Sequence, residues 1–172
     1  MIGVAHLLTV LRMLLAVALP ASLVRAITGD VAPLLLALSA VATDFLDGRL
    51  ARRAGRASRV GAWMDVGADV AFVLSGTVTA AALGMTSWLV PIAIALSSST
   101  FFLASCQRAS AGGLAYNRLG HAAGIANYGL VLLVAVHVWR PLRVVPSLLA
   151  IASEVTVALN LGAVLARGLA LR

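Results

Sequence analysis

The sequence has little of what a soluble domain displays at its surface. Only 11% of the 172 residues are charged, whereas 62% are hydrophobic, and the mean hydropathy is +1.03. A soluble domain of this length leaves a large share of its surface in water, so it cannot bury so many apolar side chains. The composition excludes an ordinary soluble protein and predicts an integral membrane protein whose apolar side chains face lipid. The length suits a single domain over residues 1–172.

Lysine is absent, and cysteine occurs once. All 13 basic residues are arginines, and with six acids the net charge is +7. In a membrane protein, arginines near helix ends set the topology and attract anionic head groups or phosphorylated substrates, so this charge does not indicate nucleic acid. The single Cys106 excludes an internal disulfide and a thiolate metal site. Abundant alanine without lysine is typical of a GC-rich genome. We expect the protein in the inner membrane of a bacterial cell.

Six apolar runs are long enough to approach a bilayer span. They predict helices over residues 4–24, 31–52, 59–83, 87–107, 122–139 and 144–166. The arginines are unevenly placed, because nine lie on the side that holds both termini, three lie on the other side, and one lies inside the first run. The side richer in arginine is normally cytoplasmic. The predicted fold class is therefore all-α, with six transmembrane helices and both termini in the cytoplasm.

Four of the six acids lie in one short stretch on two consecutive predicted helices. Asp44 and Asp47 are three residues apart on the second helix, and Asp65 and Asp69 are four apart on the third. Each spacing places a pair on one helix face, and the short connector lets the two faces converge. Neighbouring carboxylates repel one another and are unfavourable near lipid, so they require cations, and oxygen ligands suit Mg²⁺ or Mn²⁺. The sequence thus predicts a polar two-metal site, open to the cytoplasm, that acts on phosphate.

Small and basic residues accompany these acids. Gly48 and Ala51 leave room for a bulky ligand beside the second helix, and Arg52 supplies a forked cation for a phosphate. Ser58 is well placed to cap the third helix. Taken one at a time, glycines on a membrane helix are as often explained by close helix packing.

The stretch from Asp44 to Asp69 resembles the signature of the CDP-alcohol phosphatidyltransferase family. It reads D-x2-D-G-x2-A-R-x8-G-x3-D-x3-D, and all eight fixed positions are filled. The resemblance implies six transmembrane helices, usually in a homodimer, and transfer of a phosphatidyl group from a CDP-linked lipid to an alcohol, with release of CMP. It also implies that Asp44, Asp47, Asp65 and Asp69 bind two divalent ions, and that Asp69 takes the proton of the alcohol.

The same resemblance implies a site for the CDP portion of the donor. Its residues would be Gly48, Arg52, Ser58 and Gly61. Near the N-terminus, His6, Thr9 and Arg12 resemble a family segment that helps to cover the nucleotide, although the family has Asn or Asp where this chain has His6. An interfacial position at a helix start explains His6 and Thr9 equally well.

Arg108 and Arg118 lie at the ends of the longest polar connector, on the same side as the acids. They are candidates for binding a phosphate on the acceptor alcohol, and the alternative is that they only anchor the helices at the membrane surface. A phosphorylated polyol, such as glycerol 3-phosphate or inositol phosphate, suits these arginines and is the favoured acceptor, while serine, free inositol and a second phospholipid stay open. A CDP-amino-alcohol donor with diacylglycerol as acceptor stays open within the same family.

A small cation transporter is the main alternative from another class. It predicts polar residues along a path across several helices, and outside the acidic stretch the apolar runs hold little beyond Glu154 and the 97–100 segment. The acids also lie toward one membrane face, which favours an enzyme. Glu154 itself has two open explanations, a hydrogen bond to Asn127 or Asn160 and a position at a dimer contact.

Overall fold

The structure, a computed structural model, describes the backbone of residues 2–54, 59–107, 115 and 117–169, and the side chains of residues 7–46, 60–107, 115 and 117–169. The described residues form six helices and contain no strand. The helices are α1 (Ile2–Arg25), α2 (Ala32–Ala54), α3 (Arg59–Ala82), α4 (Leu89–Gln107), α5 (Arg118–Trp139) and α6 (Val145–Leu169). The predicted all-α class and the six predicted helices are confirmed.

The largest difference from the predicted boundaries is at the start of α5. The apolar pattern predicts a start at residue 122, whereas the helix begins at Arg118. Asn117 caps the helix, because its side-chain oxygen accepts a hydrogen bond from the backbone N–H of Gly120 at 2.5 Å. Asparagine is a favoured N-cap residue since it satisfies a backbone donor that the first turn leaves unpaired. Residues 118–121 are therefore the first turn of α5 and not part of a connector.

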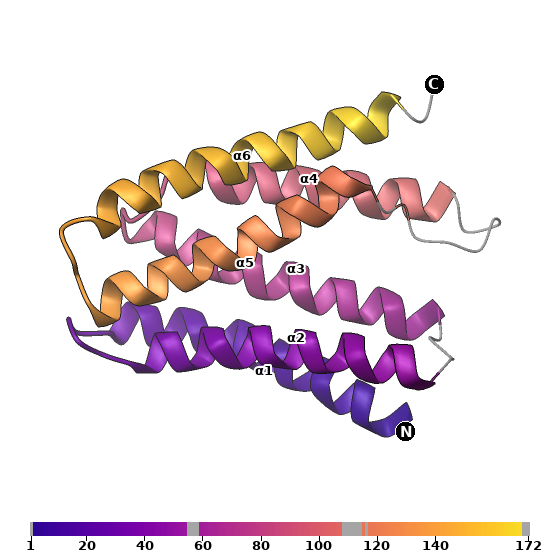
Figure 1. Cartoon of the computed structure of the whole chain (residues 1–172), viewed down its shortest axis with the longest axis horizontal. Coiled ribbons are helices and arrows are strands. Elements are labelled where there is room, and N and C mark those ends of the chain that lie inside the picture. The colour runs from indigo at the N-terminus through magenta and orange to yellow at the C-terminus, as the bar shows by residue number, and fades with distance from the viewer. Residues whose placement is uncertain (1, 55–58, 108–114, 116, 170–172) are drawn as a thin grey trace.

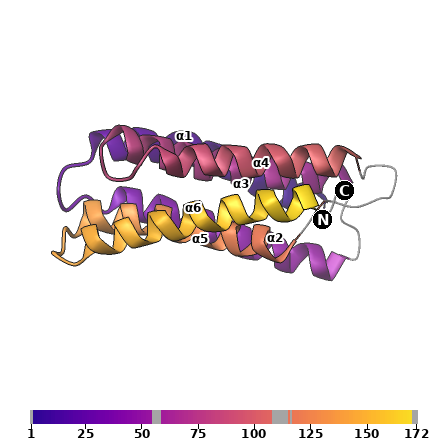
Figure 2. The same ribbon diagram turned by 90° about the horizontal axis from the view of Figure 1, so that it is seen from above.

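The helices run back and forth and pack in two layers (Figures 1 and 2). One layer holds α1, α3 and α4, and the other holds α2, α5 and α6. Contacts between α1 and α2, α3 and α5, and α4 and α6 join the layers. The start of α1 and the end of α6 lie at one end of the bundle (hereafter the N/C end), together with the end of α2, the start of α3 and the end of α4 (Figure 1). The described ends of the first and last helices thus agree with the prediction that both termini lie on one side.

A glycine lets the central helix approach its neighbours. A Cβ atom added to Gly76 of α3 would lie 3.1 Å from Leu19 of α1 and 3.3 Å from Val131 of α5. Small residues at such crossings bring helix backbones together, which is the usual source of packing energy between membrane helices. Gly76 therefore helps to hold the two layers around α3.

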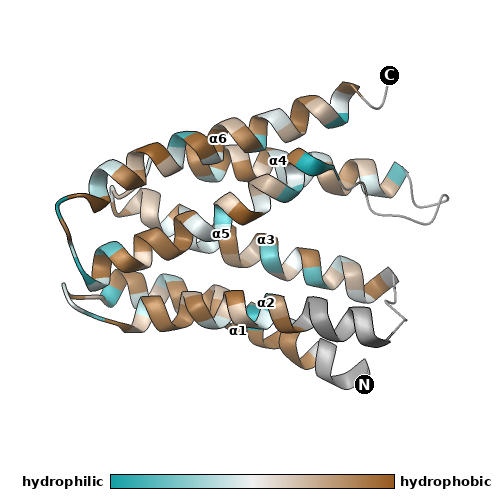
Figure 3. Cartoon of the chain, in the orientation of Figure 1, coloured by the Kyte–Doolittle hydropathy of each residue, from teal (hydrophilic) through white to brown (hydrophobic). Residues whose placement is uncertain are grey.

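The described helices are largely apolar, as the brown colour over much of each ribbon shows in Figure 3, and many of these apolar residues face outward. Large side chains such as Val17, Ile92 and Leu165 are more than half exposed. Among the described residues, five helices are long and apolar enough to cross a membrane, and α2 contributes a shorter apolar stretch over Ala32–Leu46. The protein is an integral membrane protein, because lipid is the solvent that suits this surface.

Candidate active site

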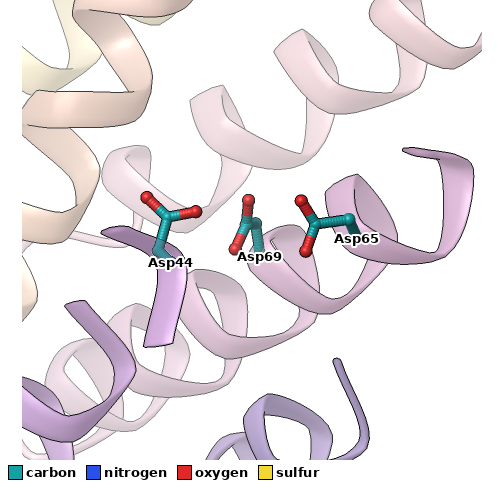
Figure 4. Close-up of side chains that lie close together, drawn as sticks. All are labelled: Asp44, Asp65 and Asp69. Atoms are coloured by element: carbon teal, nitrogen blue, oxygen red, sulfur yellow. The ribbon is translucent and has the colours of Figure 1, made fainter. Parts of the chain in front are cut away.

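Three carboxylates from α2 and α3 lie together in the half of the bundle nearer the N/C end. Asp44 belongs to α2, and Asp65 and Asp69 follow one another by one turn on α3. One carboxylate oxygen of each lies within 4.8 Å of the others. Figure 4 shows the three groups side by side, with Asp69 between Asp44 and Asp65. Helical spacing and the packing of α2 against its neighbours thus hold three like charges close together, although the carboxylates repel one another.

A buried arginine from α1 lies among these carboxylates. The Arg12 side chain is fully buried, and its Nη1 donates hydrogen bonds to Asp65 Oδ1 at 2.8 Å and to Asp69 Oδ1 at 2.5 Å. Its Nη2 lies 3.7 Å from Asp44 Oδ1. Such ion pairs are strong where water is scarce. One guanidinium of the protein therefore supplies part of the counter-charge that the acidic cluster requires.

A tyrosine from α5 completes the surroundings of Asp69. The Tyr128 hydroxyl donates a hydrogen bond to Asp69 Oδ1 at 2.7 Å. Its ring stacks on that of Phe72, with the ring centroids 5.6 Å apart and the planes inclined by 20°. Phe72 follows Asp69 by three residues on α3, so both side chains project from the same face toward α5. Helices α1, α3 and α5 therefore meet at this one carboxylate.

The clustered carboxylates fit a divalent ion. Their donor atoms are all oxygens, the ligands that Mg²⁺ and Mn²⁺ prefer. Arg12 uses only one oxygen of Asp65 and of Asp69, and within the described part of the chain the second oxygen of each has no hydrogen-bond partner. The three side chains are 27–49% exposed, so an ion can reach them. One positive and three negative side chains leave two negative charges, which suits a further cation.

The structure places three of the other predicted site residues. Thr9 is buried one turn before Arg12 on α1, and Gly61 is half-buried near the start of α3. Arg118 is exposed in the first turn of α5. The side chains of the remaining predicted residues lie outside the described ones, namely those of His6, Asp47, Gly48, Ala51, Arg52, Ser58 and Arg108.

A second buried guanidinium lies at the C-terminal end of α6. Arg167 is 7% exposed, and its Nη1 donates to the backbone oxygen of Ser97 at 2.7 Å and to Thr100 Oγ1 at 3.0 Å. A Cβ atom on Gly120 would lie 2.7 Å from Arg167 Nη2, so this arginine also lies against the first turn of α5. From the sequence, Arg167 contributed only to the count of charges. In the structure it joins α6 to α4 within the bundle.

The sequence predicts no site role for Tyr128, and it places Arg12 in the segment that covers the nucleotide rather than among the acids. Arg12 carried a signal, because a charge inside an apolar run is unfavourable in lipid unless it has partners. Tyr128 carried none, since its role arises where α5 crosses α3.

The structure also bears on Glu154, which is exposed on α6, whereas Asn160 donates a hydrogen bond to Asn127 at 2.8 Å. The two asparagines thus pair with each other, and neither pairs with Glu154.

Comparison with known proteins identifies a family. The family model described as CDP-alcohol phosphatidyltransferase matches residues 2–165, which is nearly the whole chain. No curated protein matches the sequence. The matched segment contains the three clustered carboxylates together with Arg12 and Tyr128, so the family match and the geometry concern the same site.

Proposed function

The chain belongs to the CDP-alcohol phosphatidyltransferase family, whose members are transferases of phospholipid synthesis, and we propose that it transfers the phosphatidyl group of CDP-diacylglycerol to an alcohol. The observation that carries this proposal is the meeting of Asp44, Asp65 and Asp69 in a transmembrane bundle, at a partly exposed polar site in the half nearer the N/C end. A lipid donor reaches such a site from the bilayer, and a soluble alcohol reaches it from water.

In the proposed reaction Asp69 is the base. Its carboxylate accepts the proton of the alcohol hydroxyl, and the alcohol oxygen forms a bond to the phosphorus that carries the diacylglycerol. The bond from that phosphorus to the oxygen bridging it to the second phosphate breaks, and CMP leaves with that oxygen and its electrons. The partial exposure of Asp69 supports this role, because a base must reach its substrate.

We assign metal binding to Asp44, Asp47, Asp65 and Asp69, with two Mg²⁺ or Mn²⁺ ions per site. When bound, these ions neutralise the pyrophosphate of the donor and stabilise the charge on the departing CMP. The part of this assignment that concerns Asp44, Asp65 and Asp69 is supported by their proximity. Arg12 keeps Asp65 and Asp69 together on one side of the site.

We assign the CDP portion to Gly48, Arg52, Ser58 and Gly61, with Thr9 and His6 covering the nucleotide. We assign a phosphate of the acceptor to Arg108 and Arg118, and so favour a phosphorylated polyol such as glycerol 3-phosphate or inositol phosphate. The exposure of Arg118 at the N/C end supports this assignment, because a soluble acceptor can reach that side chain.

The cellular setting is part of the same proposal. We place the N/C end in the cytoplasm of a bacterial cell, with the bundle as a homodimer in the inner membrane. The excess of arginines toward this end supports the orientation.

The proposal is tested by the release of CMP from CDP-diacylglycerol in detergent micelles. The purified protein is given a panel of alcohols that includes glycerol 3-phosphate, inositol phosphate, inositol and serine, each with Mg²⁺, with Mn²⁺ or with a chelator. We expect release only with a divalent ion and fastest with a phosphorylated polyol. Full turnover in chelator contradicts the metal assignment. A parallel assay with a CDP-amino-alcohol and diacylglycerol tests the reversed donor, and no release in any assay overturns the enzyme proposal.

A further inference from the structure

The two oxygens of Asp69 have different surroundings. Oδ1 accepts hydrogen bonds from Arg12 Nη1 at 2.5 Å and from Tyr128 Oη at 2.7 Å. A carboxylate oxygen has two lone pairs for hydrogen bonds, so these two donors saturate Oδ1. Within the described part of the chain Oδ2 has no hydrogen-bond partner, and the side chain is 27% exposed. Oδ2 is therefore the oxygen of Asp69 that is free to meet ligands, and its two lone pairs allow one contact with a metal ion and one with the substrate hydroxyl.

The hydrogen-bond donor from α5, the Tyr128 hydroxyl, is held rigidly. The ring of Tyr128 stacks on Phe72, which is fully buried in the core of the bundle. A stacked tyrosine has few side-chain angles left to fix, so its hydroxyl holds Asp69 with little loss of entropy. Arg12 approaches the same oxygen from α1 and is itself fully buried. Asp69 is thus clamped through Oδ1 by side chains from two other helices.

We propose that Tyr128 is a positioning residue of the transfer reaction: with Arg12 it holds Oδ1 of Asp69, and so presents Oδ2 to the incoming hydroxyl. This inference rests on the proposed function, in which Asp69 is the base. The last torsion angle of an aspartate is broad, so an unclamped carboxylate samples many orientations. Proton transfer requires one oxygen within hydrogen-bond distance of the hydroxyl, and the clamp raises the share of time in which Oδ2 is there.

The test is Tyr128→Phe, which removes the hydroxyl and keeps the ring on Phe72. A titration with Mn²⁺, followed by electron paramagnetic resonance on the substrate-free protein, gives the ion concentration that fills the site. CMP release is then compared above that concentration. We expect kcat to fall about 10- to 100-fold with KM for CDP-diacylglycerol nearly unchanged, because the donor binds elsewhere in the site. We expect the unfolding temperature to fall by no more than about 3 °C, since one hydrogen bond between membrane helices contributes little stability.

The matched control is Thr77→Val. It removes a buried hydroxyl from α3 that donates only to backbone oxygens of the same helix, those of Val73 and Leu74. We expect kcat of this variant to equal that of the wild type. If Tyr128→Phe does not fold, Phe72→Leu takes its place, because it keeps the hydroxyl and removes the stacking surface. A fall in kcat of about threefold or more then supports the proposal, and an unchanged kcat contradicts it.

Three results overturn the inference, and one of them also overturns the function. If kcat of Tyr128→Phe lies within about twofold of the wild-type value when the metal site is filled, Tyr128 is not a positioning residue. Full recovery of turnover with excess Mn²⁺ leads to the same conclusion, because Tyr128 then acts only on ion affinity. If the wild type itself releases no CMP with any alcohol, the proposed function fails and this inference falls with it. An active wild type beside an unimpaired Tyr128→Phe variant overturns the inference alone.

Discussion

Arg12 and Asp69 are 57 residues apart in the sequence, and they form an ion pair of 2.5 Å inside the bundle. Arg12 is fully buried, whereas Asp69 is 27% exposed. The guanidinium therefore lies on the protein side of the site, and the carboxylate lies where solvent and ligands can reach it. The pair joins α1 to α3, the helix that carries two of the three clustered acids. A protein cation that is always charged therefore stabilises part of the acidic cluster before any ion binds.

The first prediction follows from this burial. In Arg12→Gln the carboxylates lose their counter-charge while the side chain stays polar. We expect the free energy of unfolding to fall by about 3 kcal/mol in chelator, because breaking a buried ion pair leaves an uncompensated charge. Saturating Mg²⁺ should restore part of this loss, since the ion then carries more of the counter-charge. Unfolding in a detergent titration, with and without Mg²⁺, measures both effects.

Arg25→Gln is the matched control for this variant. Arg25 is an exposed arginine in the last turn of α1, away from the acidic cluster. We expect its replacement to leave the free energy of unfolding in chelator unchanged. Equal stability of Arg12→Gln and wild type in chelator would show that the ion pair does not support the fold.

The second prediction concerns Asp69 as the base. Asp69→Asn keeps the size of the side chain and an oxygen for Tyr128, but it removes the negative charge and the ability to take a proton. We expect CMP release to fall by about 10³-fold, within the range by which a general base accelerates a reaction. Asp30→Asn is the control, because Asp30 lies in the α1–α2 connection, away from the N/C end, where its oxygen accepts from the backbone of Ala32 at 2.8 Å. Residual turnover of Asp69→Asn near the wild-type rate would assign the base to another residue.

Much of this architecture could be predicted because it depends on local pattern. Each apolar run has the length of a bilayer span, so the helices follow from the solvent that such a run requires. The carboxylates of Asp65 and Asp69 share a face because they are four residues apart, which is one turn of a helix. The start of α5 was missed although its signal is local, since Asn117 is a good N-cap that the apolar count disregards.

The remainder of the site depends on how helices cross, and no local pattern contains that information. Tyr128 is adjacent to Asp69 only because α3 and α5 pack together, with Gly76 allowing α5 to come close. The arginine pattern places Arg167 near the water, whereas it is buried against α4 and the start of α5. Its long side chain lets the guanidinium reach these partners, and residue type alone does not reveal which neighbours it meets.

The third prediction concerns the packing around α3. In Gly76→Leu the new side chain meets Leu19 of α1 and Val131 of α5, which lie 3.1 and 3.3 Å from the position of its Cβ atom. We expect the free energy of unfolding to fall by about 1–3 kcal/mol, the usual effect of overfilling a packed core. Gly67→Ala on the same helix is the control, because no atom lies within 4 Å of its added Cβ atom, and its stability should not fall. An unchanged free energy of unfolding for Gly76→Leu would mean that α1 and α5 can move away from α3 without loss of stability.

The fourth prediction separates an acceptor-binding arginine from one that only anchors a helix. Arg118 is exposed in the first turn of α5, and the acidic cluster lies in the half of the bundle toward which this helix begins. If it binds the phosphate of the acceptor, Arg118→Gln should raise KM for a phosphorylated polyol about tenfold, the effect of losing one charge-assisted hydrogen bond. KM for CDP-diacylglycerol should stay the same, because that lipid lacks the acceptor phosphate.

Arg143→Gln is the matched variant for Arg118→Gln, since Arg143 is also exposed but lies in the connection between α5 and α6, at the far end of the bundle. We expect Arg143→Gln to change neither KM for the phosphorylated polyol nor KM for CDP-diacylglycerol. That result would show that losing one positive charge anywhere on the protein does not by itself raise KM for the acceptor. An unchanged acceptor KM in Arg118→Gln would leave this arginine as a membrane anchor. The same KM shift with an alcohol that has no phosphate would mean that Arg118 acts on the site as a whole, because a phosphate contact cannot affect a substrate without one.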